Sequence, residues 1–476
     1  MIADLKPYPE YKESDSPWVG QVPAHWETRP AFGAFVPNHE NNRGMKEKTV
    51  LSLSYGRIVI KPVEKLHGLV PESFETYQIV NPGDIVLRTT DLQNDHTSLR
   101  VGMVRDRGII TSAYLGLKVN KGVNPDFGWQ FLNVWDTSKA IYGYGSGLRQ
   151  NLDFSHFKRM PVTVPPPPEQ TAIVRFLDWA NGRLERAIRA KRKVIALLTE
   201  QKQAIIHRAV TRGIDPTVPL TPSGIPWLGD IPKHWEVRRL KSLSIVKRGA
   251  SPRPIADMRY FDANGEYAWV RILDVTASNR YLEKTTERLS PLGKSLSVPL
   301  EPGSLFLSIA GSVGKPIITR IKCCIHDGFV YFPQFRGNAE FLFYVLSSGR
   351  VYDGLGKLGT QLNLNTETVG SIRVPCPTPQ EQIAIATYLD KALQRYETTI
   401  NRLDREIELL REYRTRLVAD VVTGKLDVRA AAARLPEDGA LDTTGDDFQM
   451  SDETELADEE SGVASQLGRA NGPETL

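Results

Sequence analysis

One segment of the chain, residues 169–211, is repeated 212 residues later as residues 381–423. Both copies open with Glu-Gln and close with Val-Thr, and a proline-containing stretch precedes each of them. Apolar residues recur about every seven positions among charged ones, which is typical of a long helix that packs along a partner. Proline suits the start of a helix, and Gly213 with Pro216 is a stop signal after the first copy.

Two helices of equal length can bury each other's apolar stripes as an antiparallel coiled coil. Each helix would span about 65 Å at about 1.5 Å per residue. We expect the facing layers to be Leu177–Leu417, Leu184–Leu410, Lys191–Leu403, Leu198–Tyr396 and Ile205–Leu389.

A second repeat precedes each globular region. Residues 16–27 (SPWVGQVPAHWE) and 225–236 (IPWLGDIPKHWE) agree at seven of twelve positions. The sequence therefore indicates an internal duplication, in which a globular unit and a long helix each occur twice in alternating order. The predicted boundaries are a first globular domain at 1–165, a central helix at 166–213, a second globular domain at 214–377, a distal helix at 378–430 and a tail at 431–476.

Within both globular domains, Pro-Gly turns are followed by short β-type runs, as at 85–87 and 305–307. Helical patterns follow at 127–142 and 339–355. The prediction is an α+β fold with two pseudo-symmetric globular domains joined by two long antiparallel helices.

Charge is distributed unevenly along the chain. The whole sequence carries a net charge of +4, but from Glu437 onward there are twelve acidic residues against Arg469 alone. The body therefore has a balance of +15, which suits a polyanionic partner. The tail has too little apolar content to fold, so we expect it to be disordered, and a solvated tail is a simpler interpretation than a nucleic-acid mimic.

Several classes of protein are disfavoured. The chain has no eighteen-residue apolar run and no signal peptide, so we expect a cytoplasmic protein without membrane contact. Phosphate-loop, dinucleotide, metalloprotease and zinc-ligand patterns are missing, which predicts no catalytic residue, metal or cofactor. His25 and His234 lie next to the repeated tryptophans, and we interpret them as packing or hydrogen-bonding partners of those rings without an acidic companion.

Arg, Asn and Gln side chains can read base edges, while Lys, Ser and Thr hold phosphates. Both globular domains contain such residues in the segments where the two copies diverge. The DNA-binding candidates are Arg43, Lys46, Lys48, Arg57, Arg88, Thr89, Thr90, Gln93, Asn94, Arg100, Arg149 and Gln150 in the first domain, and Arg248, Arg253, Arg271, Ser308, Ser312, Lys315, Lys357 and Gln361 in the second.

The duplicated Pro-Trp-x-Gly-x-x-Pro-x-His-Trp-Glu segments and the Glu-Gln helix starts resemble those of the specificity subunit of type I restriction-modification systems. The resemblance covers residues 8 to about 430. It implies two target-recognition domains that each read one half of a split DNA site, and circular pseudo-symmetry in which residues 6–27 match 215–236. It also implies two modification subunits as partners, which carry the S-adenosylmethionine chemistry and recruit the restriction subunits.

Three alternatives stay open at this point. An orphan specificity protein could serve a different defence methyltransferase. A coiled-coil scaffold could carry two protein-binding domains, although it would need no strongly basic body. An autonomous nuclease would require a cluster of metal-binding carboxylates, which the sequence does not offer.

Overall fold

The computed structural model describes residues 5–62, 73–145, 150–355 and 364–436. The chain divides into two compact units. Unit 1 consists of residues 1–190 and 406–476, and unit 2 consists of residues 191–405. Each unit therefore contains one globular region and one half of each long helix, because each helix half packs on the globular region at its own end.

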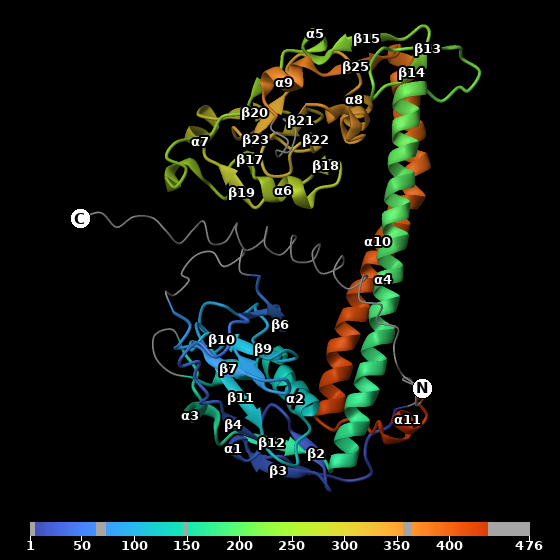
Figure 1. Cartoon of the computed structure of the whole chain (residues 1–476). Coiled ribbons are helices and arrows are strands. Elements are labelled where there is room, and N and C mark those ends of the chain that lie inside the picture. The colour runs from blue at the N-terminus through green and yellow to red at the C-terminus, as the bar shows by residue number, and fades with distance from the viewer. Residues whose placement is uncertain (1–4, 63–72, 146–149, 356–363, 437–476) are drawn as a thin grey trace. The chain divides into compact units, whose positions relative to one another are not determined.

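The long helices are α4 (Pro167–Arg212) and α10 (Pro379–Val422). In unit 1 Arg414 pairs with Glu185 at 3.2 Å, and in unit 2 Lys202 pairs with Glu397 at 2.7 Å. The start of α4 shares the core of unit 1 with the end of α10, and the end of α4 shares the core of unit 2 with the start of α10, so the pairing is antiparallel within each unit (Figure 1). The predicted α+β class with two long antiparallel helices is confirmed.

The predicted stripe is buried unevenly. Five of its residues are buried, namely Leu177, Leu184, Leu389, Leu403 and Leu417. The other four are only partly buried: Leu198, Ile205, Tyr396 and Leu410. Two helices cover only one face of each other, so stripe residues are fully enclosed mainly where a globular region adds a third wall.

Unit 1 is built from short antiparallel strands with helices packed on them (Figure 1). Its four-stranded sheet has the order β4-β11-β8-β9, and the pairs β1-β2, β3-β12, β5-β6 and β7-β10 surround it. The strands are β1 (Tyr11–Glu13), β2 (Gln21–Pro23), β3 (Glu27–Pro30), β4 (Phe35–Pro37), β5 (Leu51–Ser54), β6 (Arg57–Ile60), β7 (Gln78–Val80), β8 (Ile85–Leu87), β9 (Val101–Met103), β10 (Gly108–Ile110), β11 (Leu115–Val119) and β12 (Pro161–Val164). The short helices are α1 (Ala31–Ala34), α2 (Pro125–Thr137), η3 (Ala140–Gly143), α3 (Phe154–Phe157) and α11 (Arg429–Ala433).

Unit 2 also combines short strands with short helices, but its sheets are larger and each contains one parallel pair, β17–β23 or β18–β22. The strand orders are β16-β24-β21-β22-β18 and β19-β17-β23-β20, with the pairs β13-β14 and β15-β25 beside them. The strands are β13 (Leu220–Pro222), β14 (Asp230–Pro232), β15 (Glu236–Arg239), β16 (Lys247–Arg248), β17 (Tyr267–Val270), β18 (Tyr281–Leu282), β19 (Glu287–Leu289), β20 (Val298–Leu300), β21 (Leu305–Ser308), β22 (Pro316–Thr319), β23 (Cys323–Ile325), β24 (Phe329–Tyr331) and β25 (Arg373–Cys376). The short helices are α5 (Leu240–Leu243), η4 (Met258–Tyr260), α6 (Ile272–Ala277), α7 (Pro291–Ser295), α8 (Ala339–Ser347), η5 (Arg350–Tyr352) and α9 (Thr366–Ser371).

Each domain helix predicted from the sequence is two elements. The pattern at 127–142 becomes α2 followed by η3, and the pattern at 339–355 becomes α8 followed by η5. A residue with positive φ lies at each break, Lys139 at 63° and Gly349 at 71°. A left-handed backbone conformation cannot continue a right-handed helix, so the chain turns there.

The tail was predicted to begin at residue 431, but folded structure continues beyond that residue. Helix α11 extends to Ala433, Ala432 belongs to the core of unit 1, and Leu435 is buried. Arg175 of α4 donates to the carbonyls of Leu435 and Pro436 at 2.8 and 2.7 Å. The apolar side chains before Pro436 therefore belong to unit 1, and the remaining residues of the predicted tail lie outside the described residues.

Gly424 is required by the close approach of the chain after α10 to the repeated tryptophan segment. Its φ is +76°, and a Cβ there would lie 2.4 Å from Pro23 Cδ and 3.1 Å from Trp26. Gly20 has a similar φ of +75° with open space around it. We expect Gly20→Ala to cost about 1–2 kcal/mol for the left-handed backbone, and Gly424→Ala to add a further ~1–3 kcal/mol of overpacking. Urea unfolding of both variants measures the difference, and equal midpoints would contradict the close packing.

Candidate nucleic-acid interface

The start of α4 is fixed by a buried carboxylate, Glu169. Trp26 Nε1 donates to its Oε1 at 2.8 Å, and the Tyr8 hydroxyl donates to the same atom at 2.6 Å. His25 Nε2 lies 2.7 Å from Oε2. Burial and the hydrogen bond to Glu169 raise the pKa of Tyr8. The repeated tryptophan segment is thus held on the first turn of the helix, where a carboxylate also complements the helix dipole.

The start of α10 is fixed in the same way. Trp235 Nε1 donates to Glu381 Oε1 at 3.1 Å, and His234 Nε2 lies 2.8 Å from that oxygen. Thr378 donates its backbone N–H and its hydroxyl to Oε2 at 2.9 and 2.8 Å. Although burial raises it, hydrogen bonds from Trp235, His234 and Thr378 lower the pKa of Glu381 to about 2.

The interpretation of the histidines without an acidic companion is wrong. Both histidines contact a glutamate, at positions 169 and 381. These glutamates were visible in the sequence as part of the other repeat, with the same offset of 212. Because more than 140 residues separate each histidine from its partner, only matching the two repeats to each other could have indicated the contact.

The glutamine that follows each glutamate anchors the globular region. Gln170 accepts from the backbone N–H of Asn124 at 2.6 Å, and Gln382 accepts from that of Asn338 at 2.8 Å. Both asparagines are N-caps, of α2 and α8 respectively. Each Glu-Gln pair therefore joins a tryptophan segment, a long helix and a domain helix, and we call these two assemblies the joints.

In unit 1 four of the DNA-binding candidates are exposed on the segment before β5 or on the β5–β6 hairpin. These are Arg43, Lys46, Lys48 and Arg57. Their exposure leaves them accessible to a ligand, as the sequence hypothesis requires.

Four further candidates, Arg88, Thr89, Thr90 and Arg100, lie in the β8–β9 loop, residues 88–100. Arg88 is partly exposed and pairs with Asp95 at 3.4 Å, and Thr90 is partly buried. Thr89 and Arg100 are buried, with 6% and 0% of their surface exposed. Neither buried side chain is available to a ligand, which corrects the sequence-based assignment of both residues.

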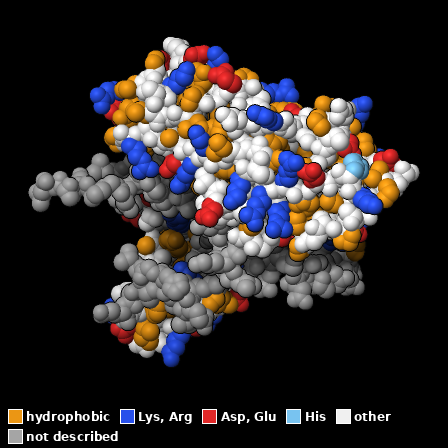
Figure 2. All heavy atoms as spheres, turned by 90° about the horizontal axis from the view of Figure 1, so that it is seen from above, with side chains coloured by type: hydrophobic (Ala, Val, Ile, Leu, Met, Phe, Trp, Pro, Cys, Tyr) orange, Lys and Arg blue, Asp and Glu red, His pale blue; other side chains and the backbone are white. Residues whose placement is uncertain are grey.

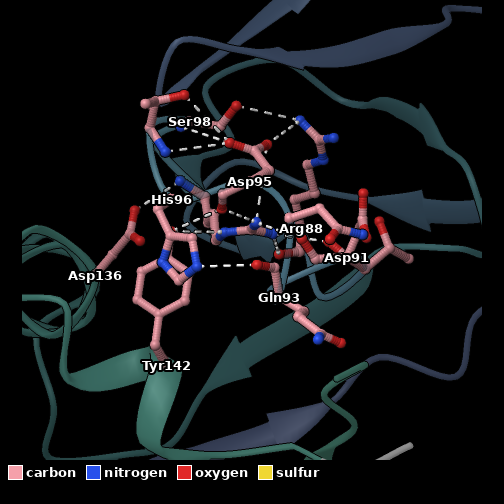
Figure 3. A network of polar contacts seen from close by, with 12 residues as sticks. Arg88, Asp91, Gln93, Asp95, His96, Ser98, Asp136 and Tyr142 are labelled. Carbon is pink, nitrogen blue, oxygen red and sulfur yellow. Dashed lines mark hydrogen bonds and ion pairs between the residues drawn. The ribbon is translucent and has the colours of Figure 1, made fainter. Parts of the chain in front are cut away.

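The Arg100 side chain stabilises the β8–β9 loop. Its guanidinium donates to the backbone carbonyls of Arg88, Thr90, Asp91 and Asp95 at 3.3, 2.8, 3.2 and 2.6 Å. Its backbone N–H donates to Asp136 of α2 at 2.6 Å. Although burial raises it, hydrogen bonds from Ser98 and Thr97 and the charge of Arg100 lower the pKa of Asp95 to about 2. A buried cation thus organises a loop without regular secondary structure (Figure 3).

The tip of this loop carries the candidates Gln93 and Asn94, which are both exposed. The Gln93 side chain points away from the network in Figure 3. Asn94 Nδ2 donates to Asp91 Oδ1 at 2.8 Å. His96 stacks on Tyr142 of η3 with ring centroids 4.5 Å apart, and its Nε2 lies 3.0 Å from the Gln93 carbonyl.

Gln150 supports the segment that follows η3. Its Nε2 donates to the carbonyls of Tyr142 and Tyr144 at 2.7 and 3.1 Å. Arg149, Lys357 and Gln361 lie outside the described residues.

In unit 2 two of the arginine candidates are paired with acids. Arg253 pairs with the Asp327 carboxylate at 3.2 Å, and Arg271 pairs with Glu287. Arg248 donates instead to the backbone carbonyl of Asp327. Arg253 is nevertheless 79% exposed, so its charge remains accessible to solvent.

The remaining candidates of unit 2 lie at or near the β21–β22 loop. Ser308 is fully buried and donates to the Ala310 carbonyl at 2.7 Å, so it is not accessible to DNA, which corrects its assignment. Ser312 bonds to Thr276 Oγ1 at 2.8 Å, and Lys315 donates to the Thr276 carbonyl at 3.0 Å. Burial lowers the pKa of Lys315.

One basic surface was missed by the sequence reasoning. Exposed Arg238 and Arg239 of β15, Lys241 of α5 and Arg373 of β25 lie together, and Arg239 is the cross-strand partner of Arg373. Figure 2 shows Lys and Arg side chains gathered on this end of unit 2. Three of the four residues lie within residues 238–241, so a local basic run was visible in the sequence. Strand pairing adds Arg373, which lies far away along the chain and could not be assigned to this surface from the sequence.

Within the described ranges, no helix combines the length and apolar character that crossing a bilayer requires. In that same part of the chain, no three His, Cys, Asp or Glu side chains come together as a metal-binding group.

Residues 232–409 match the family model of the type I restriction modification DNA specificity domain. The chain is 24% identical over 371 residues to the type I restriction enzyme MjaVIII specificity subunit of Methanocaldococcus jannaschii, an alignment that covers 74% of this chain and 81% of the relative. It is 22% identical over 449 residues to the putative type I restriction enzyme MjaX specificity subunit of the same organism, with coverage of 90% and 100%. The resemblance stated from the sequence is confirmed.

A solved structure shares the fold. A chain from a study of complex assembly and conformational transition of the type I R-M system superposes with a TM-score of 0.61 at 16% identity. The superposition covers 85% of this chain and 99% of that one.

Proposed function

We propose that the chain is the non-catalytic subunit that recognises DNA sequence in a type I restriction-modification complex, because it is similar to type I restriction enzyme specificity subunits and residues 232–409 match the DNA specificity domain. Each globular region reads one half of a bipartite site. In this proposal the S-adenosylmethionine chemistry belongs to modification subunits in the cytoplasm, through which restriction subunits are recruited.

The observation that carries the proposal is that the two units have similar joints but different loops. The two joints use the same Glu-Gln, His-Trp and Asn contacts. The loops of the two units differ in length. The β8–β9 loop of unit 1 spans residues 88–100, whereas the corresponding β21–β22 loop of unit 2 spans residues 309–315. Two similar joints with unlike loops suit an asymmetric bipartite target contacted by identical partner subunits.

The helix pair is proposed to set the length of the spacer between the half-sites. Helices α4 and α10 are each continuous from one unit into the other. Inserting one heptad into both helices, at positions 191 and 403, which the sequence predicts to face each other, lengthens each helix by about 10 Å. At about 3.4 Å per base pair, we expect the gap between the two halves of the methylated motif to grow by roughly three base pairs.

Methylation mapping of DNA from cells that express the complex measures this gap. A variant in which the same heptad replaces native residues, without changing helix length, is the matched control. A gap that stays constant in the insertion variant would contradict the proposal that the helices act as a spacer.

Two modification subunits are proposed to dock on equivalent positions of the two helices. Leu197 of α4 and Leu409 of α10 are related by the repeat offset of 212, and they are 52% and 48% exposed. Large exposed apolar side chains at equivalent positions are suited to a protein interface. The tryptophans of the repeated segments are largely enclosed in the units, so their rings are not available as part of this surface.

We expect Leu197→Glu and Leu409→Glu each to remove one modification subunit from the complex, and the double variant to remove both. A buried charge at a central interface position costs about 2 kcal/mol or more. Native mass spectrometry counts the bound subunits, and Glu200→Lys on an exposed site of α4 is the control. Two subunits retained by the double variant would place the docking surface elsewhere.

A further inference from the structure

We propose that Gln93 and Asn94, at the tip of the β8–β9 loop, determine specificity in the half-site read by unit 1, and that Arg100 is the positioning residue that holds this tip. The inference rests on the proposed DNA-recognition function and assigns the contact to particular side chains.

The β8–β9 loop is long for a connection between neighbouring antiparallel strands, and it encloses a buried cation. Strands β8 and β9 pair antiparallel, and such strands can be joined by two residues. Here the connection spans residues 88–100 and encloses a fully buried guanidinium. Removing a cation from water is unfavourable unless its hydrogen bonds are satisfied. All its contacts on the loop are to backbone carbonyls and Asp95, so the cation fixes the backbone path and leaves the side chains of the tip outward.

The network holds the loop at both ends and in the middle. Asn151 accepts from the Asp91 backbone N–H at 3.0 Å, and the Leu152 N–H donates to the Thr89 carbonyl at 2.8 Å. Lys139 donates to the His96 carbonyl at 2.7 Å. A loop tied down in this way loses little conformational entropy when it binds, which increases both affinity and discrimination.

The side chains that the loop presents have the chemistry of base readout. Gln and Asn carry a donor and an acceptor side by side, and both can bond adenine N6 and N7 in the major groove. The Gln93 amide extends from the loop in Figure 3. Asn94 uses one N–H on Asp91 and keeps its Oδ1 and the second N–H for a ligand.

Cationic side chains lie at the base of the loop that carries the tip. Arg88 is partly exposed at the base of the loop. The β5–β6 turn packs on the loop through Gly56 and Leu99, which places exposed Arg57 beside it. Arginines next to amides match the division between phosphate contacts, which position a protein, and base contacts, which specify sequence.

The test is methylation mapping in cells that carry the full chain and its modification subunits, with Gln93→Ala, Asn94→Ala and Arg100→Lys variants. Arg100→Lys keeps the charge but loses the planar fork of donors. Gln201→Ala, at an exposed glutamine of α4, is the matched control. Loss of a bidentate contact relaxes discrimination at a base pair by roughly tenfold to hundredfold.

We expect Gln93→Ala and Asn94→Ala each to relax the motif at one or two base pairs within one half-site only. Arg100→Lys should relax the same half-site more broadly, with the other half and the spacer unchanged. If both alanine variants methylate the wild-type motif with wild-type selectivity, or if both half-sites change, the inference is overturned. Failure of the proposed function looks different, because the wild-type complex would then yield no bipartite motif at all.

Discussion

Replacing Trp26 by alanine is expected to destabilise unit 1 by about 3–5 kcal/mol, the usual cost of removing a large aromatic side chain from a core. Trp26 is fully buried, and its ring lies edge-on to Phe127 and Tyr8 at centroid distances of 6.4 and 6.0 Å. Its indole N–H is a donor to Glu169, which is only 5% exposed. The variant therefore leaves a cavity and a buried carboxylate that lacks one of its donors.

Denaturant unfolding followed by hydrogen exchange identifies the affected unit. We expect faster exchange in unit 1 and unchanged protection in the globular region of unit 2, with the reverse for Trp235→Ala. Trp179→Ala is the control, because that tryptophan is only partly buried on α4. A loss of stability in Trp26→Ala no larger than in Trp179→Ala would show that the joint contributes little.

The joints illustrate what the sequence could predict about this fold. Periodicity and repetition predicted three of the four ends of the long helices to within one residue, because a heptad pattern depends only on neighbours along the chain. The predicted distal helix at 378–430 is too long, since α10 ends at Val422 and the residues that follow it turn back onto unit 1. The role of Glu169 was not predicted, since its three partners lie in a segment more than 140 residues earlier. A repeat identifies equivalent residues in the two copies, but only the folded structure shows which residues they contact.

At the candidate interface, the sequence identified suitable residue types but not which of them are exposed. Residue type selected Gln93, Asn94 and Arg100 together, because all three side chains can bond to DNA. The structure separates them into two exposed amides and one fully buried cation. Burial in an irregular loop depends on contacts with α2 and η3, and no local pattern encodes such contacts.

Replacing Arg100 by methionine is expected to lower the free energy of unfolding by about 3–5 kcal/mol, because it leaves the buried backbone carbonyls that Arg100 bonds without their donor. Methionine fills similar space but donates no hydrogen bonds to the carbonyls of the loop. Amide exchange within residues 88–98 should accelerate more than exchange in the surrounding sheet. Arg105→Met is the matched control, since Arg105 is 64% exposed and pairs with Asp126 at the surface.

The pH dependence of stability separates loss of the charge from loss of packing. The pKa of Asp95 is about 2 in the folded protein against an ordinary 3.8. A carboxylate with a lowered pKa contributes stability that is fully present above about pH 4 and is lost as the pH falls toward 2. Without the Arg100 charge the pKa of Asp95 rises toward its ordinary value, so Arg100→Met should lose less stability than the wild type between pH 4 and pH 2. Equal acid sensitivity in both proteins would mean that the hydrogen bonds from Ser98 and Thr97, and not the buried cation, hold this carboxylate ionised.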